Sequence, residues 1–321
     1  MINRNSLRKL ECWNASPSKS STALSPNSST QEYTPASTTP SVSREFSLAV
    51  HSASYAETRS LIQAAPPQGQ TRLLHPDREL VEQALIRDES TTHSDLISKY
   101  FDHSETASEL CLHLHQHAEL ARAMYAPLLD IFALMEPSCD RAFILFLEFD
   151  NRDNPLPNSH TFGDIRSALS VLKTQLDKRF LKSRSRVGLI RRVVAAAPVC
   201  VGGAACLRNP DATENRELAG LAQLDATAKC AYVLSNDLGT IDSLVARLRA
   251  AVEGDKALVR LGLERGRERF TVQEVLKQLS KSHGSFLQQL EDLEEHICLC
   301  FYTVNKARSF LLQEICNCQT L

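Results

Sequence analysis

Apolar residues recur at helical spacing along most of this 321-residue chain. In four segments they are separated mainly by three, four or seven positions, which places them on one side of a helix. The four stripes run from Leu96 to Phe132, from Ile165 to Phe180, from Leu218 to Val252 and from Leu287 to Ile315. Long amphipathic helices bury such stripes by packing against one another, so the pattern predicts an all-α fold, an elongated antiparallel helical bundle.

Shorter helices are expected between the long ones. One is predicted within 42–63 and a second from about Asp77. Residues 137–149 are apolar almost all round, which indicates a short buried helix. The stripe from Leu218 predicts a helix of about ten turns.

Local signals predict where helices begin and end. Thr161 is expected to cap the helix that follows it. Thr271 and Glu274 have the spacing of a capping box, which predicts a helix start near residue 272. Gly284 is expected to interrupt that helix.

These patterns divide the chain into four parts. Residues 1–40 are rich in Ser, Thr and Pro and carry too little apolar surface to fold, so they predict a disordered tail. Residues 41–183 form the N-terminal helical part of the bundle, and 184–210 a basic and then apolar connection. Residues 211–321 form the C-terminal long-helix part of the same bundle.

The most distinctive segment runs from Lys178 to Leu207. Seven Lys and Arg residues up to Arg192 are followed by an apolar run without charge. The run is shorter than the roughly 20 residues of a membrane-spanning helix, and Pro198 interrupts it. Three interpretations stay open: the tip of a helical hairpin, insertion into one face of a membrane, and a membrane span. The candidate membrane contacts are Arg184, Arg186, Arg191, Arg192, Val193, Val194, Val199 and Val201.

Composition narrows the partners and the compartment. The 36 basic and 38 acidic side chains nearly cancel, so no overall field attracts nucleic acid, and nucleic acid is not an expected partner. The N-terminal residues lack the apolar stretch of a secretion signal, so the ten cysteines are expected to be reduced. We expect a cytoplasmic protein, or one peripheral to the plasma membrane, that is not secreted.

Candidate metal and catalytic motifs are weak. On a helix His113 and His117 share a face while His115 points away, and Cys298 and Cys300 diverge in the same manner, so no metal site is expected. Phosphate-binding loops, nucleophile elbows and isolated carboxylate pairs are missing from the sequence. We therefore expect no cofactor and no enzymatic activity.

The C-terminal cysteines are candidates for lipidation. Cys318 stands four residues from the end and satisfies the bare prenylation pattern, and Cys316 would supply a second lipid. The alternative is a frayed helix end without modification.

Four segments carry a family resemblance: 43–57, 95–128, 221–248 and 272–315. In order and spacing they resemble a plant uncharacterised protein family of the UPF type, related to integrin-like membrane-associated proteins. The resemblance implies a helical, membrane-associated protein without catalytic residues. Relatives usually carry a longer Ala- and Val-rich region after the basic residues, which here is shortened.

These observations favour a non-enzymatic helical scaffold or interaction protein at the cytoplasmic face of a plant membrane. The alternative is a soluble coiled-coil adaptor that acts in signalling or development without membrane contact. Expected partners are proteins that bind the helical surfaces, together with a membrane surface. Long amphipathic helices pack within one chain or between chains equally well, so oligomers are compatible with the pattern.

Overall fold

The computed structural model describes residues 52–64, 73–87, 93–132, 138–158, 162–196, 210–266 and 268–319. These residues contain helices and no strand, which confirms the all-α fold. The helices are α3 (Ala53–Ala64), α4 (Arg78–Arg87), α5 (Ser94–Phe132), α6 (Cys139–Asn151), α7 (Gly163–Ala196), α8 (Pro210–Glu264) and α9 (Arg269–Gln319). The chain divides into the units Met1–Ala53 and Ser54–Leu321, and the description concerns the second.

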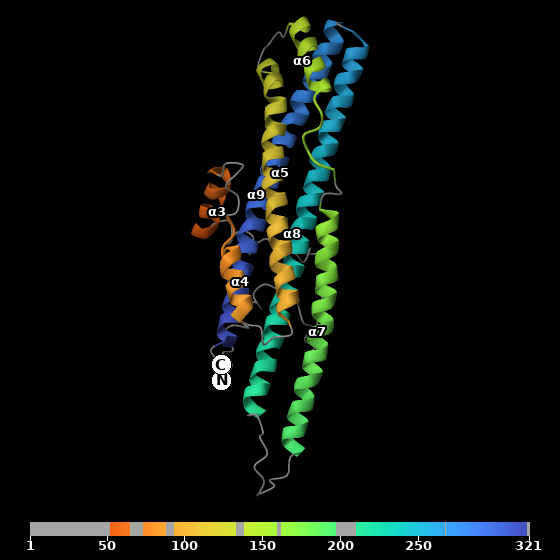
Figure 1. Cartoon of the computed structure of the whole chain (residues 1–321). Coiled ribbons are helices and arrows are strands. Elements are labelled where there is room, and N and C mark those ends of the chain that lie inside the picture. The colour runs from red at the N-terminus through yellow and green to blue at the C-terminus, as the bar shows by residue number, and fades with distance from the viewer. Residues whose placement is uncertain are drawn as a thin grey trace, which may run out of the picture. The chain divides into compact units, whose positions relative to one another are not determined.

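Four long helices form an antiparallel bundle within this unit (Figure 1). Helix α8 packs against α7 on one side and α9 on the other, and α5 packs against α9 and α7. The short helix α6 contacts α5, α8 and α9 at the end that α7 does not reach. At the opposite end, the last turns of α7 and the first turns of α8 extend past the other helices as a two-helix hairpin (Figure 1).

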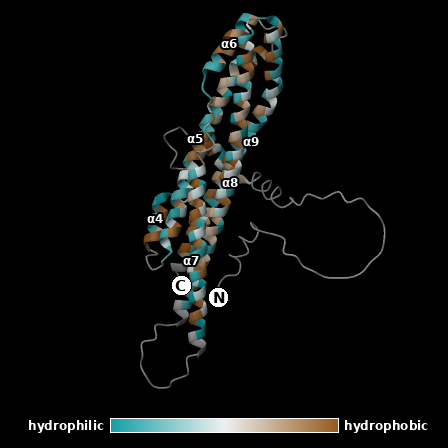
Figure 2. Ribbon diagram, turned by 90° about the vertical axis from the view of Figure 1, so that its right-hand side faces the viewer, coloured by the Kyte–Doolittle hydropathy of each residue, from teal (hydrophilic) through white to brown (hydrophobic). Residues whose placement is uncertain are grey.

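The predicted apolar stripes form the core of the bundle. Figure 2 shows hydrophobic and hydrophilic residues alternating along the helices, as expected for helices that bury one side. Tyr100, Ala107 and Leu128 of α5 are buried, as are Leu238 of α8 and Leu293 of α9. Because an α-helix rises 1.5 Å per residue, the 55 residues of α8 extend for about 80 Å.

A buried arginine joins the start of α4 to the bundle. Arg308 on α9 is only 1% exposed, and its guanidinium donates to the carbonyl of Pro76 from Nη2 at 3.0 Å. Its Nη1 donates to Ser104 Oγ at 2.9 Å and to the carbonyl of Phe101 at 3.3 Å. One side chain of α9 therefore holds both the segment before α4 and helix α5.

Two local signals predicted for α9 are wrong, although the helix begins within three residues of the predicted start near 272. Helix α9 begins at Arg269, so Thr271 lies inside it, and Thr271 Oγ1 lies 3.5 Å from Glu268 Oε2. Glu274 instead accepts a hydrogen bond from a glutamine one turn later, so the capping box does not form. Gly284 does not interrupt α9, because the buried stripes on both sides of it outweigh the roughly 1 kcal/mol that a helical glycine costs.

Two further predictions need correction. Helix α6 is buried on one face only, since Ile144 is 52% exposed and Leu147 43% exposed. Its buried residues Phe146 and Phe149 face the bundle. The helix predicted from the Leu218 stripe to have about ten turns is longer: α8 has 55 residues, or about 15 turns.

Some predictions fall outside the described residues. These are the N-terminal tail 1–40, the first part of the helix predicted within 42–63, and the cap at Thr161. The rest of 42–63 lies largely in α3.

Candidate functional site

Helix α7 positions the basic residues predicted as a site. It runs without interruption from Gly163 to Ala196, so the basic part of the predicted connection is helical. Its inner side is anchored by Leu169, Leu172, Leu176 and Val187, all buried. The basic residues occupy the other sides in about the last five turns, and no acidic residue occurs between Lys178 and Pro210.

A polar contact fixes the rotation of α7 near its end. Ser183 is 2% exposed, and its Oγ lies 3.3 Å from Nε2 of His93 in hydrogen-bonding geometry. His93 also lies against Gly220 of α8, where an added Cβ would come within 3.2 Å of the imidazole Cδ2. The absence of a side chain at Gly220 thus lets the imidazole fit beside α8.

The four predicted arginines are exposed but do not face one direction. Arg191 Nε donates to Glu214 Oε1 of α8 at 2.6 Å, which points it along the hairpin. Arg184 lies on nearly the same side as Arg191, whereas Arg186 and Arg192 lie on other sides. Their arrangement spreads positive charge around the end of α7.

The outward face of α7 contains residues that the sequence reasoning missed. We define this face as Lys178, Leu181, Lys182, Ser185, Leu189 and Arg192, which recur at steps of one, three or four and are all exposed. Leu181 is 61% exposed and Leu189 is 58% exposed. The signal was present, because both leucines lie opposite the buried stripe, but leucines on a helix are normally assigned to the core.

The predicted apolar and lipidation residues are only partly described. Val193 and Val194 belong to α7, whereas Val199 and Val201 fall outside the described residues. Cys316 is exposed on α9, and Cys318 lies on the same helix. These predictions therefore stay untested.

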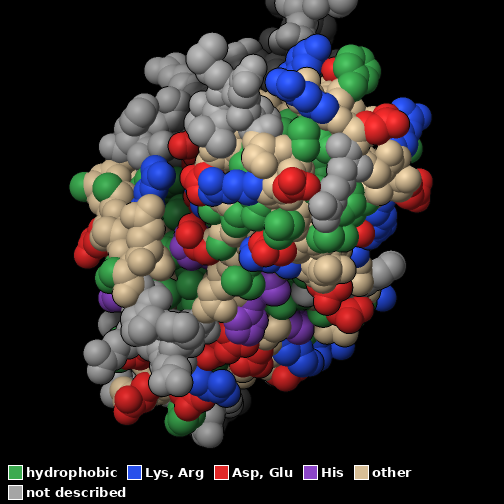
Figure 3. All heavy atoms as spheres, turned by 90° about the horizontal axis from the view of Figure 1, so that it is seen from above, with side chains coloured by type: hydrophobic (Ala, Val, Ile, Leu, Met, Phe, Trp, Pro, Cys, Tyr) green, Lys and Arg blue, Asp and Glu red, His purple; other side chains and the backbone are tan. Residues whose placement is uncertain are grey.

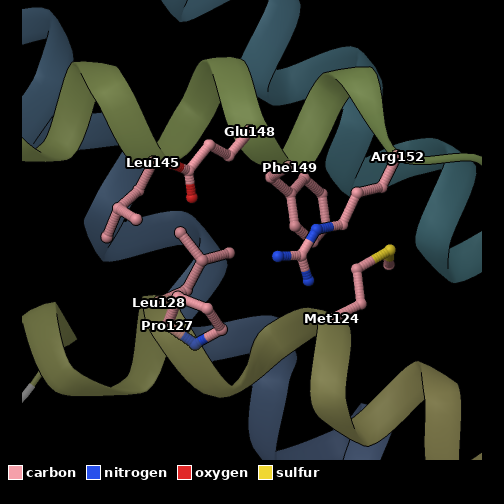
Figure 4. A pocket seen from close by; sticks show the side chains of 7 residues that line it. All are labelled: Met124, Pro127, Leu128, Leu145, Glu148, Phe149 and Arg152. Carbon is pink, nitrogen blue, oxygen red and sulfur yellow. The ribbon is translucent and has the colours of Figure 1, made fainter.

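The opposite end of the bundle has a different surface. Seen from above in Figure 3, Lys and Arg side chains are interspersed there with Asp and Glu, without one dominant sign. A small pocket between α5 and α6 is lined by Met124, Leu128, Phe149 and Arg152 (Figure 4). Its volume of about 10 Å³ has room for about one water molecule, too little for a small-molecule ligand.

A buried polar network lies beside this pocket. Tyr125 donates from its hydroxyl to Asp255 Oδ2 at 2.7 Å, and Ser282 Oγ lies 3.1 Å from Asp255 Oδ1. Burial raises the pKa of Asp255, and these two hydrogen bonds partly offset the effect. The His283 ring packs on Tyr125 and has no hydrogen-bond partner among the described residues, so it does not activate Ser282. The network joins α5, α8 and α9.

A second, half-buried carboxylate lies on α8. Burial raises the pKa of Asp237 to about 7. Its Oδ2 has no hydrogen-bond partner in the described structure. Burial and, to a lesser extent, nearby charges that include Asp237 raise the pKa of Tyr100 well above its ordinary value. The partial removal of water around Asp237 therefore disfavours its charged form.

The cysteine and histidine motifs do not converge. Cys298 and Cys300 are buried, while His113 is exposed and His117 half-buried. Among the described residues, no three His, Cys, Asp or Glu side chains gather in a way that could hold a metal ion. None of the helices in these ranges combines the length and hydropathy that crossing a membrane requires.

Comparison with known proteins places the chain in a family. It is 38% identical over 325 residues to UPF0496 protein At3g19250 of Arabidopsis thaliana, covering 87% of this chain and 90% of that protein. The chain belongs to the UPF0496 family. It is also 26% identical over 300 residues to UPF0496 protein At1g20180 of Arabidopsis thaliana, covering 76% of each. The predicted plant family is confirmed, and the relation to integrin-like proteins stays a prediction.

Two other comparisons gave no match. No family model matches this UPF0496 chain. No solved structure matches it.

Proposed function

We propose that this chain is a non-enzymatic helical scaffold that associates with the cytoplasmic face of a plant membrane through the basic end of α7. The observation that carries the proposal is the run of seven exposed Lys and Arg residues between Lys178 and Arg192, with no acidic residue up to Pro210. The last part of this run lies where α7 and α8 extend past the other helices (Figure 1). A flat surface can therefore approach it without meeting the rest of the bundle.

The electrostatic attraction is large enough to matter. Each Lys or Arg near an anionic leaflet contributes about 1 kcal/mol, so several acting together support reversible binding. Arg191 contributes less, because its ion pair with Glu214 already offsets part of its charge. Arg184, Arg186 and Arg192 show no ion pair among the described residues. The helical surfaces farther along the bundle bind protein partners in this proposal.

Fractionation of plant cell extract tests the proposed location. Release of the protein by high salt is expected, because salt screens attraction between exposed charges. A protein found wholly in the soluble fraction at low salt would contradict the proposal and favour a soluble adaptor that acts through helix contacts.

Charge-neutral variants test the residues. The variant with Gln at Arg184, Arg186, Arg191 and Arg192 is expected to move to the soluble fraction. A control variant removes the same number of charges elsewhere, with Gln at Arg59, Arg141, Arg247 and Lys281, which are also exposed. The control variant is expected to stay with the membrane. An equal loss of membrane binding in both variants would show that binding depends on net charge alone.

A further inference from the structure

The outward face of α7 combines exposed leucines with cations. Leu181 and Leu189 are separated by eight residues, or about 12 Å along the helix. Lys178 and Lys182 flank the first leucine, and Arg192 follows the second by one turn. Single exposed leucines are common on protein surfaces and need no explanation. The informative feature is that both leucines lie on one helical face and have long basic neighbours.

The charge of this face selects an anionic occupant. All its charged members are basic, and no acidic residue follows Lys178 before the start of α8. Asp177, just before the face, is paired with Lys173 at 2.8 Å. An anionic surface therefore meets attraction along the whole face.

The mixture of residue types favours lipid over an acidic protein helix. Lys and Arg can lie with their methylene stems along an apolar layer while their charged ends reach outward to phosphates. Helices that lie in the membrane interface combine such cations with leucines, which enter the boundary between headgroups and acyl chains by roughly 5–10 Å. The leucines of α7 are too widely spaced to form the continuous seam that a partner helix would need.

We infer that α7 lies along an anionic lipid surface with Leu181 and Leu189 inserted below the headgroups and with Lys178, Lys182 and Arg192 at the phosphates. This inference rests on the proposed function and adds an orientation to it. The hairpin lies side-on to the membrane, with the outward face of α7 down, rather than entering it tip-first.

Leucine variants measure the apolar contribution. The full chain is mixed with phosphatidylcholine vesicles that contain phosphatidylserine, and bound protein is sedimented. The double variant Leu181→Gln with Leu189→Gln is expected to bind about tenfold more weakly, since two half-exposed leucines lose their transfer into the interface. The matched control is Leu61→Gln with Leu80→Gln on α3 and α4, where the leucines are 48% and 47% exposed. The control should bind like the unmodified chain.

Tryptophan fluorescence reports insertion directly. Trp13 is the single tryptophan of the chain, so Trp13→Phe gives a silent background. In this background Leu181→Trp and Leu189→Trp are each expected to shift their emission to the blue on the same vesicles. Leu80→Trp is the control and should not shift. This measurement also covers the case in which a glutamine variant fails to fold.

The outcomes separate the inference from the proposed function. If the unmodified chain binds the vesicles, but the double variant at Leu181 and Leu189 keeps its affinity and no tryptophan on α7 shifts its emission, side-on insertion is overturned while the electrostatic contact stands. If the unmodified chain does not bind the vesicles, both are overturned. Binding to soluble polyglutamate in that case would identify an acidic protein as the partner.

Discussion

Replacing Asp237 by Asn should stabilise the bundle at neutral and alkaline pH. The carboxyl has a pKa of about 7 in the folded protein against an ordinary 3.8, because burial removes water from the charged form. A pKa difference of this size lowers the free energy of unfolding by roughly 4 kcal/mol at pH above 7. The amide of Asn is also buried without a full set of partners, which costs about 1–2 kcal/mol. A net gain of about 2 kcal/mol is therefore expected.

The direction of the pH dependence follows from the raised pKa. Between 3.8 and about 7 the folded chain holds a proton on Asp237 that the unfolded chain has released. The unmodified protein therefore loses stability as pH rises through this window. Above the window, the stability that protonation of Asp237 provided at low pH is fully lost. The Asp237→Asn variant cannot ionise at this position and lacks this loss.

Urea unfolding of both proteins, measured from about pH 4 to about pH 8, tests the reasoning. Other groups also make stability depend on pH, including Asp255, whose pKa burial raises, and His283, whose pKa burial lowers. The difference between variant and unmodified chain isolates Asp237 from them. A difference that does not change with pH, or that favours Asp at alkaline pH, would show that the carboxylate is hydrated in the folded protein.

Three further substitutions test the packing. Arg308→Met should lower the free energy of unfolding by about 3 kcal/mol or more, since it leaves the buried carbonyl of Pro76 without its donor; an unchanged urea midpoint would contradict the contact. Tyr125→Phe should cost about 2 kcal/mol near neutral pH, because Asp255 loses its 2.7 Å hydrogen bond, and calorimetry would reveal a loss close to zero if that bond is weak. Gly284→Ala should raise the melting temperature, because the position is exposed and an added Cβ meets nothing within 4 Å; a lower value would indicate a break in the helix there.

The long helices could be predicted from the sequence because their apolar stripes persist over many turns. Leu224, Leu238 and Val252 are buried as their spacing predicted. Helix boundaries were harder to predict, since Thr271 has the chemistry of a cap but lies within a helix that starts before it. A local motif cannot show where packing against another helix begins.

Buried polar groups could not be predicted from the spacing of apolar positions. An arginine is usually a surface residue, and only the fold shows that the segment at Pro76 and helix α5 both contact Arg308. The same applies to the candidate site. The basic run was evident, but that Leu181 and Leu189 share its outward face depends on the rotation of α7, which contacts such as that between Ser183 and His93 fix.

The most direct test is the salt dependence of vesicle binding by the full chain. Binding to phosphatidylcholine vesicles with phosphatidylserine, and not to phosphatidylcholine alone, is expected at low salt and should weaken as salt screens the cations. The variant with Gln at Arg184, Arg186, Arg191 and Arg192 should bind far less than the control with Gln at Arg59, Arg141, Arg247 and Lys281. Equal binding by the two variants, or no preference for the anionic vesicles, would contradict a membrane role for the basic end of α7.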